Sequence, residues 1–566
     1  MLKTLPLIVS SLLLFSCCSP DTAQGAGSSL EGEKEFVRGI NILSRNEECA
    51  LRAIDGAASA GDNHLELSHR LIMNLCQLWD SSTLNMVSTL AALAHAEGIS
   101  EVCVWDHALY DTDYYPTEFY YPGTGLLDLD KPELWDWIAA DYRDLLSLCP
   151  EIDGLVLTFI ESGAGIEHQF SSMSVPQRLA KVVNTVSKVV CGEFGKTLWL
   201  RTFAYNEKQY ADITDCFEMV DWRPGMGLMI KESPHDFFLT HPANPLIGRL
   251  AHPTLVEFDA CGEYHGQGVI AGMIPEHFAE RWRSFRDLPD VVGYVARTDR
   301  CGDYQIIGTT MEINLHALRR VTDDALISVK DIEKEFITAR YGSCALKPLR
   351  KAFRASRDII DGSMYILGLN TASHSAFRLD DPSTFSRHVA GRWTGSDSVF
   401  LAHGVDREFH WWRDLVSVMA PPSCKKLDAK RAADTSEVLA AGLIAEGELM
   451  SEEYIDYALA WTDDCLKGAR NGLRALKRAR RSLSPEDYAA LFDMYERSLM
   501  CMRLRRDSLV VDWGERAMSR GEEFRTRSLE RKVARARRQL RVDQRRYASY
   551  SKPYPKGTWD FLKDAE

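Results

Sequence analysis

The stretch GLVLTFIESGAG, residues 154–165, decides the fold class of this chain of 566 residues. Residues 154–160 are almost wholly apolar, as in a strand that is buried on both faces, and such strands belong to parallel sheets covered by helices. The run ends in a carboxylate, Glu161, and a glycine-broken loop follows it. A buried strand, a polar residue at its end and a flexible loop together predict one βα unit of a parallel α/β fold.

Seven further apolar runs alternate with helical stretches in the same way. The eight predicted strands lie at residues 36–43, 65–67, 102–105, 154–159, 197–203, 227–230, 255–259 and 291–296. Eight strands within about 290 residues match a closed (β/α)8 TIM barrel, which usually takes about 250 residues. After residue 327 the pattern is helical almost throughout, with long amphipathic stretches at 437–481 and 485–506. We therefore predict a barrel at 35–325 and a mostly α-helical C-terminal domain at 326–566.

The N-terminal residues have the composition of an export signal. Lys3 precedes a short apolar run that cannot span a bilayer but suits the core of a signal peptide. The run ends at Ser16 and Cys17, the pattern of a bacterial lipobox. We expect a signal peptide at 1–17, lipidation of Cys17 and a flexible tether at 18–34. The chain would then be an exported lipoprotein, anchored in the outer membrane by this lipid alone and facing the periplasm or the cell surface. An ordinary secretory signal with incidental cysteines is the alternative.

Composition excludes several classes of protein. The net charge of -14 argues against nucleic acid as a partner. Basic residues cluster at 477–481 and 531–541, but apolar residues interrupt them at helical spacing, which predicts solvated helix faces. Apart from Cys17 and Cys18, the 14 cysteines are scattered singly, without the paired spacing of a zinc site or a disulfide framework. We expect neither a metal nor a cofactor.

Barrel geometry indicates where catalytic residues should lie. They occupy the C-terminal ends of the strands and the loops that follow, which together form the barrel mouth. Glu161 follows the fourth predicted strand, Arg201 lies in the fifth, and Glu263, Tyr264 and His265 follow the seventh. Carboxylates, basic groups and aromatic rings at one barrel mouth are typical of a sugar site, where acids act on the glycosidic bond and rings stack on the sugar.

Other strand ends supply weaker candidates for substrate contacts. These are Trp105, Asp106, Arg297 and Asp299. The structural alternative at such positions is a packed tryptophan or an ion pair within the protein. Glu257 and Asp259 alternate with apolar residues along the seventh strand, and residues of the inner barrel layers are usually structural.

Six segments between about residues 130 and 340 resemble, in order, segments of the family 67 α-glucuronidases. The first is the tryptophan-rich WDW at 135–137, leading to IDG at 152–154 where the family has Pro-Asp-Phe-Gly-Gly. The second is LTFIESG at 157–163, similar to a strand ending in Ser-Glu-Gly, and the third is WLRTF at 199–203, similar to Trp-Arg-Ala-Phe. Then come KESPHDF at 231–237, PLIG at 245–248 and EYHGQ at 263–267, which resemble Lys-Asn-Gly-Pro-Ile-Asp-Phe, Pro-Leu-Phe-Gly and Glu-Tyr-Leu-Gly-Gln.

This resemblance implies an inverting hydrolase that removes an α-linked, glucuronic acid-like sugar from an oligo- or polysaccharide. Glu161 would be the general acid, and Asp236 with Glu263 would be the base pair. Inversion requires a gap of about 6.5 to 9.5 Å between acid and base, against about 5 to 5.5 Å in a retaining enzyme. The resemblance also implies that Arg201 and Lys231 hold the carboxylate of the sugar, and that the C-terminal helices form a homodimer.

Two departures from the family pattern widen the choice of substrate. The family has a further lysine four residues before the acid, where this chain has Leu157, and its usual β-rich domain before the barrel is missing. The substrate could therefore be another uronide or a neutral sugar. Two other hypotheses stay open: a surface glycan-binding lipoprotein without activity, and a retaining glycosidase in which Glu161 works with Glu257 or Asp259 as nucleophile.

Overall fold

The computed structural model describes residues 36–204, 207–234, 236–239, 243–300, 304–366, 369–370, 375, 452–519 and 526–550. Cys17 lies outside these residues, as do the whole predicted signal peptide and tether. The first part of the predicted amphipathic stretch, residues 437–451, also lies outside them. Within the described part of the chain, no helix is long and apolar enough to cross a membrane.

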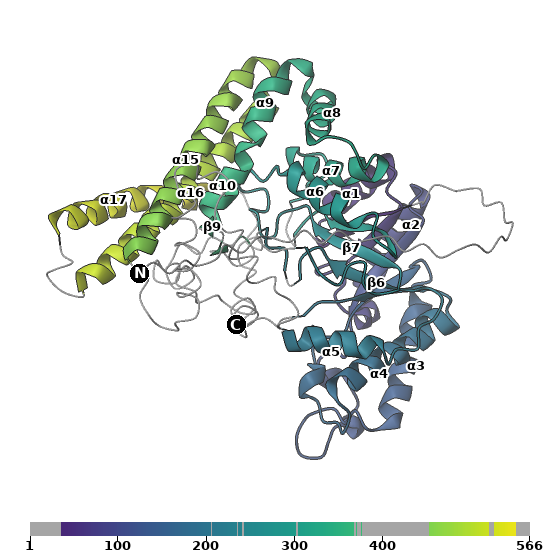
Figure 1. Cartoon of the computed structure of the whole chain (residues 1–566). Coiled ribbons are helices and arrows are strands. Elements are labelled where there is room, and N and C mark those ends of the chain that lie inside the picture. Colours follow the sequence, from purple (N-terminus) through teal and green to yellow (C-terminus); the bar gives the residue numbers. More distant parts are fainter. Residues whose placement is uncertain are drawn as a thin grey trace, which may run out of the picture. The chain divides into compact units, whose positions relative to one another are not determined.

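Eight parallel strands close into a barrel in chain order (Figure 1). They are β1 Val37–Ile42, β2 His64–Leu67, β3 Glu101–His107, β4 Gly154–Thr158, β5 Thr197–Arg201, β6 Met226–Lys231, β7 Thr254–Asp259 and β8 Val291–Arg297. β1 pairs with both β2 and β8, which closes the sheet and leaves no edge strand. Every strand predicted from the sequence is present, with ends shifted by at most two residues. The predicted (β/α)8 barrel is confirmed.

Helices follow most of the strands and cover the outside of the barrel. They are α1 Glu47–Ser59, α2 Ser81–Ala96, α3 Pro132–Leu148, α4 Val175–Ser187, α5 Glu207–Phe217, α6 Pro275–Phe285 and α7 Ile313–Asp323. Local signals start them: the side chains of Asn46 and Asp80 cap α1 and α2, and proline occupies the first turn of α3, α4 and α6. Between β6 and β7 the described residues form a long loop without a helix, and this loop carries Asp236.

Successive side chains of each strand point to opposite faces of the barrel wall. Val156 and Trp199 belong to a small apolar cluster inside the barrel, whereas Leu155 and Leu157 belong to the large core between strands and helices. Leu157 therefore faces the helices, and a lysine in its place would point away from the mouth.

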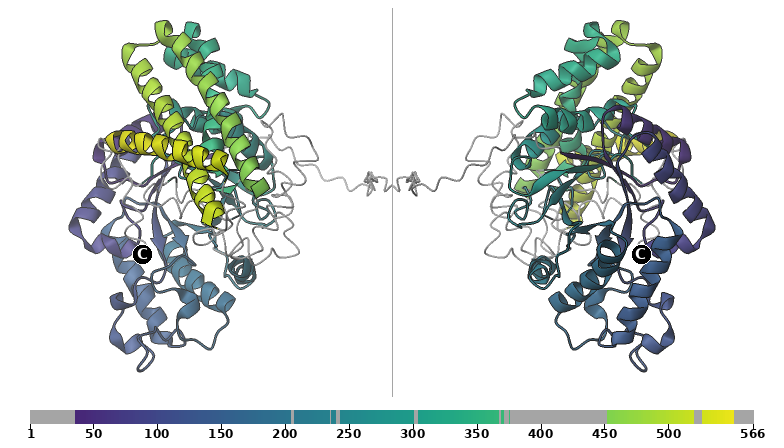
Figure 2. Two further views of the ribbon diagram at one scale, coloured as in Figure 1. Left: turned by 90° about the vertical axis from the view of Figure 1, so that its left-hand side faces the viewer. Right: turned by 90° about the vertical axis from the view of Figure 1, so that its right-hand side faces the viewer.

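The C-terminal region is helical, as predicted. It comprises α8 Val329–Tyr341, α9 Leu346–Phe353, α10 Ala355–Ser363, α15 Glu452–Ala479, α16 Pro485–Ser519 and α17 Arg527–Tyr550. Figures 1 and 2 show α15 and α16 running side by side, and α15 also packs against α9 and α10. Hydrogen bonds join α16 to the loop after β7, where Ser498 accepts from the backbone of Ala271 and Arg497 donates to the carbonyl of Val269. The helices are therefore packed onto the barrel.

Candidate active site

Alternating carboxylates and guanidiniums cross the barrel mouth as one chain of ion pairs. Arg201, at the end of β5, donates from Nε and Nη2 to Glu257 of β7, at 2.8 and 3.3 Å. Arg297, at the end of β8, binds the same carboxylate at 2.9 Å and reaches Glu263 at 2.6 Å. Arg300 binds the other oxygen of Glu263 at 2.7 Å. All five side chains are buried, and each charge faces an opposite one, the condition under which buried ions are tolerated.

Glu161 lies where this chain of ion pairs opens to solvent. Its Oε2 is 3.7 Å from Nη1 of Arg201. The Glu161 side chain is 36% exposed, compared with 3% for Glu263 and none for Glu257. Nη1 of Arg201 is buried and has no hydrogen-bond partner among the described residues. The predicted acid and the predicted carboxylate-binding arginine thus lie together, and the arginine keeps one donor without a hydrogen bond.

Asp236 is held by two partners that are themselves predicted site residues. Lys231, at the end of β6, donates from Nζ to Oδ1 at 2.6 Å, and the Tyr264 hydroxyl donates to Oδ2. The lysine nitrogen lies 4.2 and 4.5 Å from the ring centroids of Phe203 and Phe237. Burial lowers the pKa of the Lys231 amine, and the Asp236 carboxylate opposes this shift. Lys231 carries three donors, and the bond to Asp236 uses one of them.

Trp105 lies beneath the cations of the mouth. Its ring centroid is 4.5 Å from the guanidinium carbon of Arg201 and 5.6 Å from that of Arg297. Its indole N–H donates to Oε2 of Glu66, at 2.8 Å. Because the side chain is 1% exposed, its role in the structure is to support the guanidiniums.

Three predicted substrate contacts are held by other parts of the protein. Asp106 accepts hydrogen bonds from the Leu75 backbone, at 2.8 Å, and from the Tyr142 hydroxyl, outside the barrel wall. His265 is buried 6.0 Å from the ring of Phe278 on α6, where burial lowers the pKa of the imidazole to about 3. Asp299 accepts from two backbone N–H groups just after β1, at 2.7 and 3.1 Å. Hydrogen bonds within the protein therefore hold Asp106 and Asp299, and a ring contact holds His265.

Glu257 and Asp259, the alternative nucleophiles, are fully engaged by the protein. Burial alone would raise the pKa of Glu257, but Arg201 and Arg297 outweigh it and hold the pKa below its ordinary value. Burial and the charge of Glu263 raise the pKa of Asp259 to about 6. Asp259 accepts from two backbone N–H groups of the turn that carries Glu263, at 3.0 and 2.5 Å. Both carboxylates thus hold other groups of the mouth in place.

Two residues of the mouth are not among the predicted site residues. Arg300 follows β8 by three residues, and His69 follows β2 by two. The backbone of His69 has a φ of +52°, and its ring lies 5.1 Å from that of Trp105. Glu161 is identified by its place after an apolar strand. Ser68 and His69 also follow such a strand, so the same signal could have identified His69.

The helical region holds the two loops that carry the candidate base residues. The Tyr365 hydroxyl donates to the carbonyl of Tyr264 at 2.8 Å and accepts from the backbone of Leu239 at 3.3 Å. The first bond holds the loop after β7, and the second holds the loop after β6. Ser375 donates to the carbonyl of Glu263 at 2.6 Å. Both hydroxyl-bearing residues are buried, so the loops are fixed from behind.

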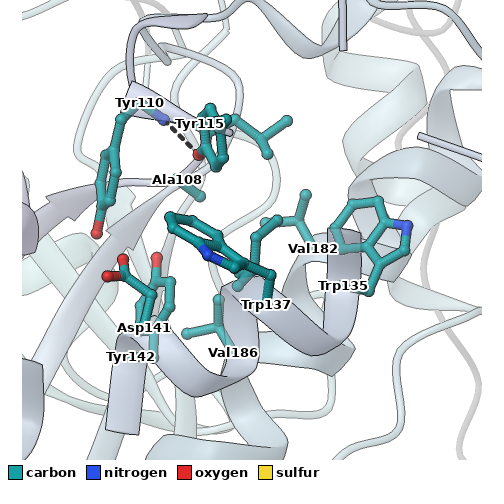
Figure 3. Close-up of a pocket in the computed structure, with 11 residues that line it drawn as sticks. Ala108, Tyr110, Tyr115, Trp135, Trp137, Asp141, Tyr142, Val182 and Val186 are labelled. Carbon is teal, nitrogen blue, oxygen red and sulfur yellow. Dashed lines mark hydrogen bonds between the residues drawn. The ribbon is translucent and has the colours of Figure 1, made fainter. Parts of the chain in front are cut away.

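A separate aromatic pocket lies between the loop after β3 and helices α3 and α4 (Figure 3). Its lining residues are Ala108, Leu109, Tyr110, Tyr115, Trp135, Trp137, Ile138, Asp141, Tyr142, Val182 and Val186. Burial raises the pKa of Asp141 in this pocket to about 6. The Tyr115 hydroxyl accepts from the Tyr110 backbone at 2.9 Å. None of the predicted site residues lines this pocket, so it is distinct from the barrel mouth.

No protein-family profile matches this sequence, and no curated protein matches it. Among solved structures, a GH138 enzyme targeting pectin rhamnogalacturonan II is similar, with a TM-score of 0.51 and 11% identity. The similarity covers 90% of this chain and 60% of the GH138 enzyme, so this chain spans about 60% of that enzyme's length.

Two further solved structures have lower TM-scores. A point mutant of the Thermobaculum terrenum O-GlcNAc hydrolase has a TM-score of 0.39 and 11% identity, over 85% of this chain and 96% of that one. CpGH84B has a TM-score of 0.43 and 9% identity, over 90% and 73%. Together with the strand topology, the GH138 similarity shows the fold, a closed (β/α)8 barrel. The resemblance to family 67 rests on the segments of the sequence alone.

Proposed function

We propose that the chain is an inverting glycoside hydrolase that removes an α-linked, glucuronic acid-like sugar from an oligo- or polysaccharide. One observation carries the proposal: the partly exposed Glu161 carboxyl lies 3.7 Å from a buried Arg201 donor that has no hydrogen-bond partner among the described residues. An acid that faces solvent beside an unused cationic donor suits the cleavage of an anionic sugar. The glycoside hydrolase-like barrel supports the reaction class.

Selectivity for a uronic acid would come from Arg201 and Lys231. Nη1 of Arg201 and the two remaining Lys231 donors can reach a carboxylate without breaking the bonds to Glu257 and Asp236. Both cations lie near the Phe203 ring, at 5.4 and 4.2 Å, and both are nearly buried. A carboxylate entering this dry site gains strong charge-assisted hydrogen bonds, and a neutral hexose does not.

Exposure favours Asp236 over Glu263 as the base. In an inverting enzyme the base has to contact the attacking water. The side chain of Asp236 is 13% exposed, compared with 3% for Glu263, whose two oxygens each bind an arginine. We therefore assign Asp236 to water activation, and we assign Glu263 to the fixing of Arg297 and Arg300.

Replacement of Glu161 by glutamine tests the reaction class. Its rate on natural oligosaccharides should fall by about 10² to 10⁴. The loss should be smaller on nitrophenyl α-glucuronide, because that leaving group needs less protonation. The substrate panel should include pectin rhamnogalacturonan II fragments, since the GH138 enzyme targets that polysaccharide. Glu118→Gln, an exposed position in the loop after β3, is the matched control.

NMR of the first product anomer tests the stereochemistry in the same assay. Inversion predicts the β-anomer from an α-linked substrate, and the α-anomer would establish a retaining enzyme. If the native protein cleaves no acidic or neutral oligosaccharide but binds one, the chain is a glycan-binding protein. Full activity of Glu161→Gln would remove Glu161 from the mechanism.

We also propose that the chain is an exported lipoprotein, attached to the outer membrane through Cys17. The composition of the first seventeen residues supports this assignment. Mass spectrometry of the mature N-terminal peptide should find a lipid-modified Cys17, and an unmodified terminus would contradict the proposal. A homodimer through the C-terminal helices belongs to the same set of proposals, and light scattering of the purified chain tests it.

A further inference from the structure

We propose that His69 is a further substrate-binding residue of the barrel mouth, and that its Nε2 accepts a hydrogen bond from a sugar hydroxyl. His69 follows β2, on the side of the mouth where Trp105 supports the guanidiniums of Arg201 and Arg297. The proposal takes the nature of its ligand from the proposed function. Its structural premise, the position of the ring proton, is independent of that function.

A series of hydrogen bonds determines which nitrogen of His69 carries the proton. Asn41 donates from Nδ2 to the Glu66 carboxylate at 2.7 Å, which turns the amide oxygen toward Ser68. The Ser68 hydroxyl donates to this amide oxygen at 2.6 Å, because a carbonyl oxygen can only accept. The Ser68 oxygen has then used its proton and must accept from Nδ1 of His69, at 3.0 Å. The ring is therefore protonated at Nδ1, and Nε2 carries a lone pair.

The ring is held at the mouth in one orientation. The left-handed backbone, with a φ of +52°, is strained for a residue with a side chain, and such conformations gather at binding sites. The ring lies 5.1 Å from Trp105 at an interplanar angle of 47°, and the residue is half-buried. Nε2 makes no hydrogen bond to any residue that the structure describes. The one acceptor of the ring is thus available to a ligand.

The surrounding charges keep this acceptor available. Burial and the positive charges of Arg300 and Arg297 lower the pKa of His69 well below its ordinary value, so the ring stays neutral. The other cationic groups of the mouth, Arg201 and Lys231, only donate hydrogen bonds. A sugar hydroxyl donates as well as accepts, and His69 offers an acceptor that neither carries charge nor takes part in the proposed acid-base chemistry.

Nitrogen NMR of the full chain, labelled at histidine, tests the position of the proton. We expect a neutral ring protonated at Nδ1 from pH 5 to 8, and we expect Ser68→Ala to abolish this preference. The resonances are assigned with His69→Asn, because asparagine tolerates the left-handed backbone. A proton on Nε2, or a ring that becomes cationic in this range, overturns the proposal.

Titration with glucuronic acid, glucose and xylose tests the contact with the sugar. We expect at least one of them to shift the Nε2 resonance in a saturable way, and His69→Asn to weaken its binding about tenfold. His252→Asn is the matched control, because His252 precedes β7 at the opposite end of the barrel and stacks on Trp222.

Two results overturn the assignment of His69: binding without a shift of Nε2 and without loss in His69→Asn, or no binding of any of the three sugars. Binding with the expected shift but without hydrolysis of any substrate supports His69 and rejects the proposed hydrolase. Hydrolysis with an unmoved Nε2 rejects the role of His69 alone. The two proposals can therefore fail separately.

Discussion

A buried histidine at the N-terminal end of the barrel predicts how stability depends on pH. His64 opens β2 and has no exposed surface. Its Nδ1 lies 2.7 Å from Oε2 of Glu101, and its Nε2 lies 3.3 Å from Oε1 of Glu66. Burial opposes the charged ring, but the Glu101 and Glu66 carboxylates outweigh burial and raise the pKa of His64 to about 10. His64 is therefore an imidazolium at neutral pH.

The raised pKa of His64 sets the size and the sign of the effect. The folded value of about 10 exceeds the ordinary value of 6.5 by about 3.5, which at 1.36 kcal/mol for each pH unit is worth about 5 kcal/mol. Because the pKa is raised in the folded state, this stabilisation is complete below pH 6.5 and is lost as the pH rises through about 10. Glu101 has its pKa lowered to about 2 by the same contact, so the two shifts are not added.

Urea unfolding of the native chain and of His64→Gln, at intervals from pH 6 to 10, measures this contribution. The difference in unfolding free energy should shrink by about 1.4 kcal/mol for each pH unit between 6.5 and 10. His252→Gln is the control, because burial lowers the pKa of His252 and its effect on stability should be constant above pH 6.5. A native-to-variant difference that stays constant over the alkaline range would refute the buried imidazolium.

Three further substitutions test the mouth and the barrel wall. Arg201→Lys keeps a charge but loses the forked contact, and kcat/KM on uronides should fall roughly 100-fold while activity on neutral glycosides changes little. Tyr365→Phe releases two loops and should lower the unfolding free energy by about 1 to 3 kcal/mol and kcat about tenfold, with KM nearly unchanged; an unchanged kcat would contradict the role in positioning. Gly293→Ala places a Cβ 2.1 Å from the Val37 carbonyl, so thermal unfolding should show a large loss of stability, whereas Gly192→Ala meets nothing within 4 Å and should show none.

The strands were predictable because eight runs of buried apolar residues recur between helical segments. Several residues of the barrel mouth were predictable because they lie at the ends of these runs. Arg201, Lys231 and Arg297 all end strands with side chains inside the barrel. The same reasoning placed both Trp105 and Asp106 at the mouth, although consecutive residues of a strand point to opposite faces. Which of two consecutive residues points into the barrel depends on how the strand packs against the helices, and a single sequence does not reveal this packing.

The ion pairs of the mouth were beyond sequence reasoning. Glu257 binds Arg201 and Arg297, which are 56 and 40 positions away along the chain. Its partners are decided by the order and register of strands in the closed barrel. The second predicted strand ends at Leu67, and the two polar residues that follow it are not among the predicted site residues. The position of His265 depends on the geometry of a turn, because the turn held by Asp259 directs this side chain toward α6.

The two faces of the barrel wall carry different kinds of residue. Outward residues such as Leu155 pack against helices, and inward residues change along the barrel from apolar Val156 and Trp199 to charged Arg201 and Glu257 at the mouth. Buried ion pairs add little net stability, so the stability of the barrel has to come from its apolar layers. The ion pairs at the mouth fix the positions of the charged groups. Loss of a linking group such as Glu257 would leave two buried guanidiniums facing each other and would destabilise the fold. Glu161 lies at the exposed end of the chain of ion pairs, so its replacement should separate activity from stability.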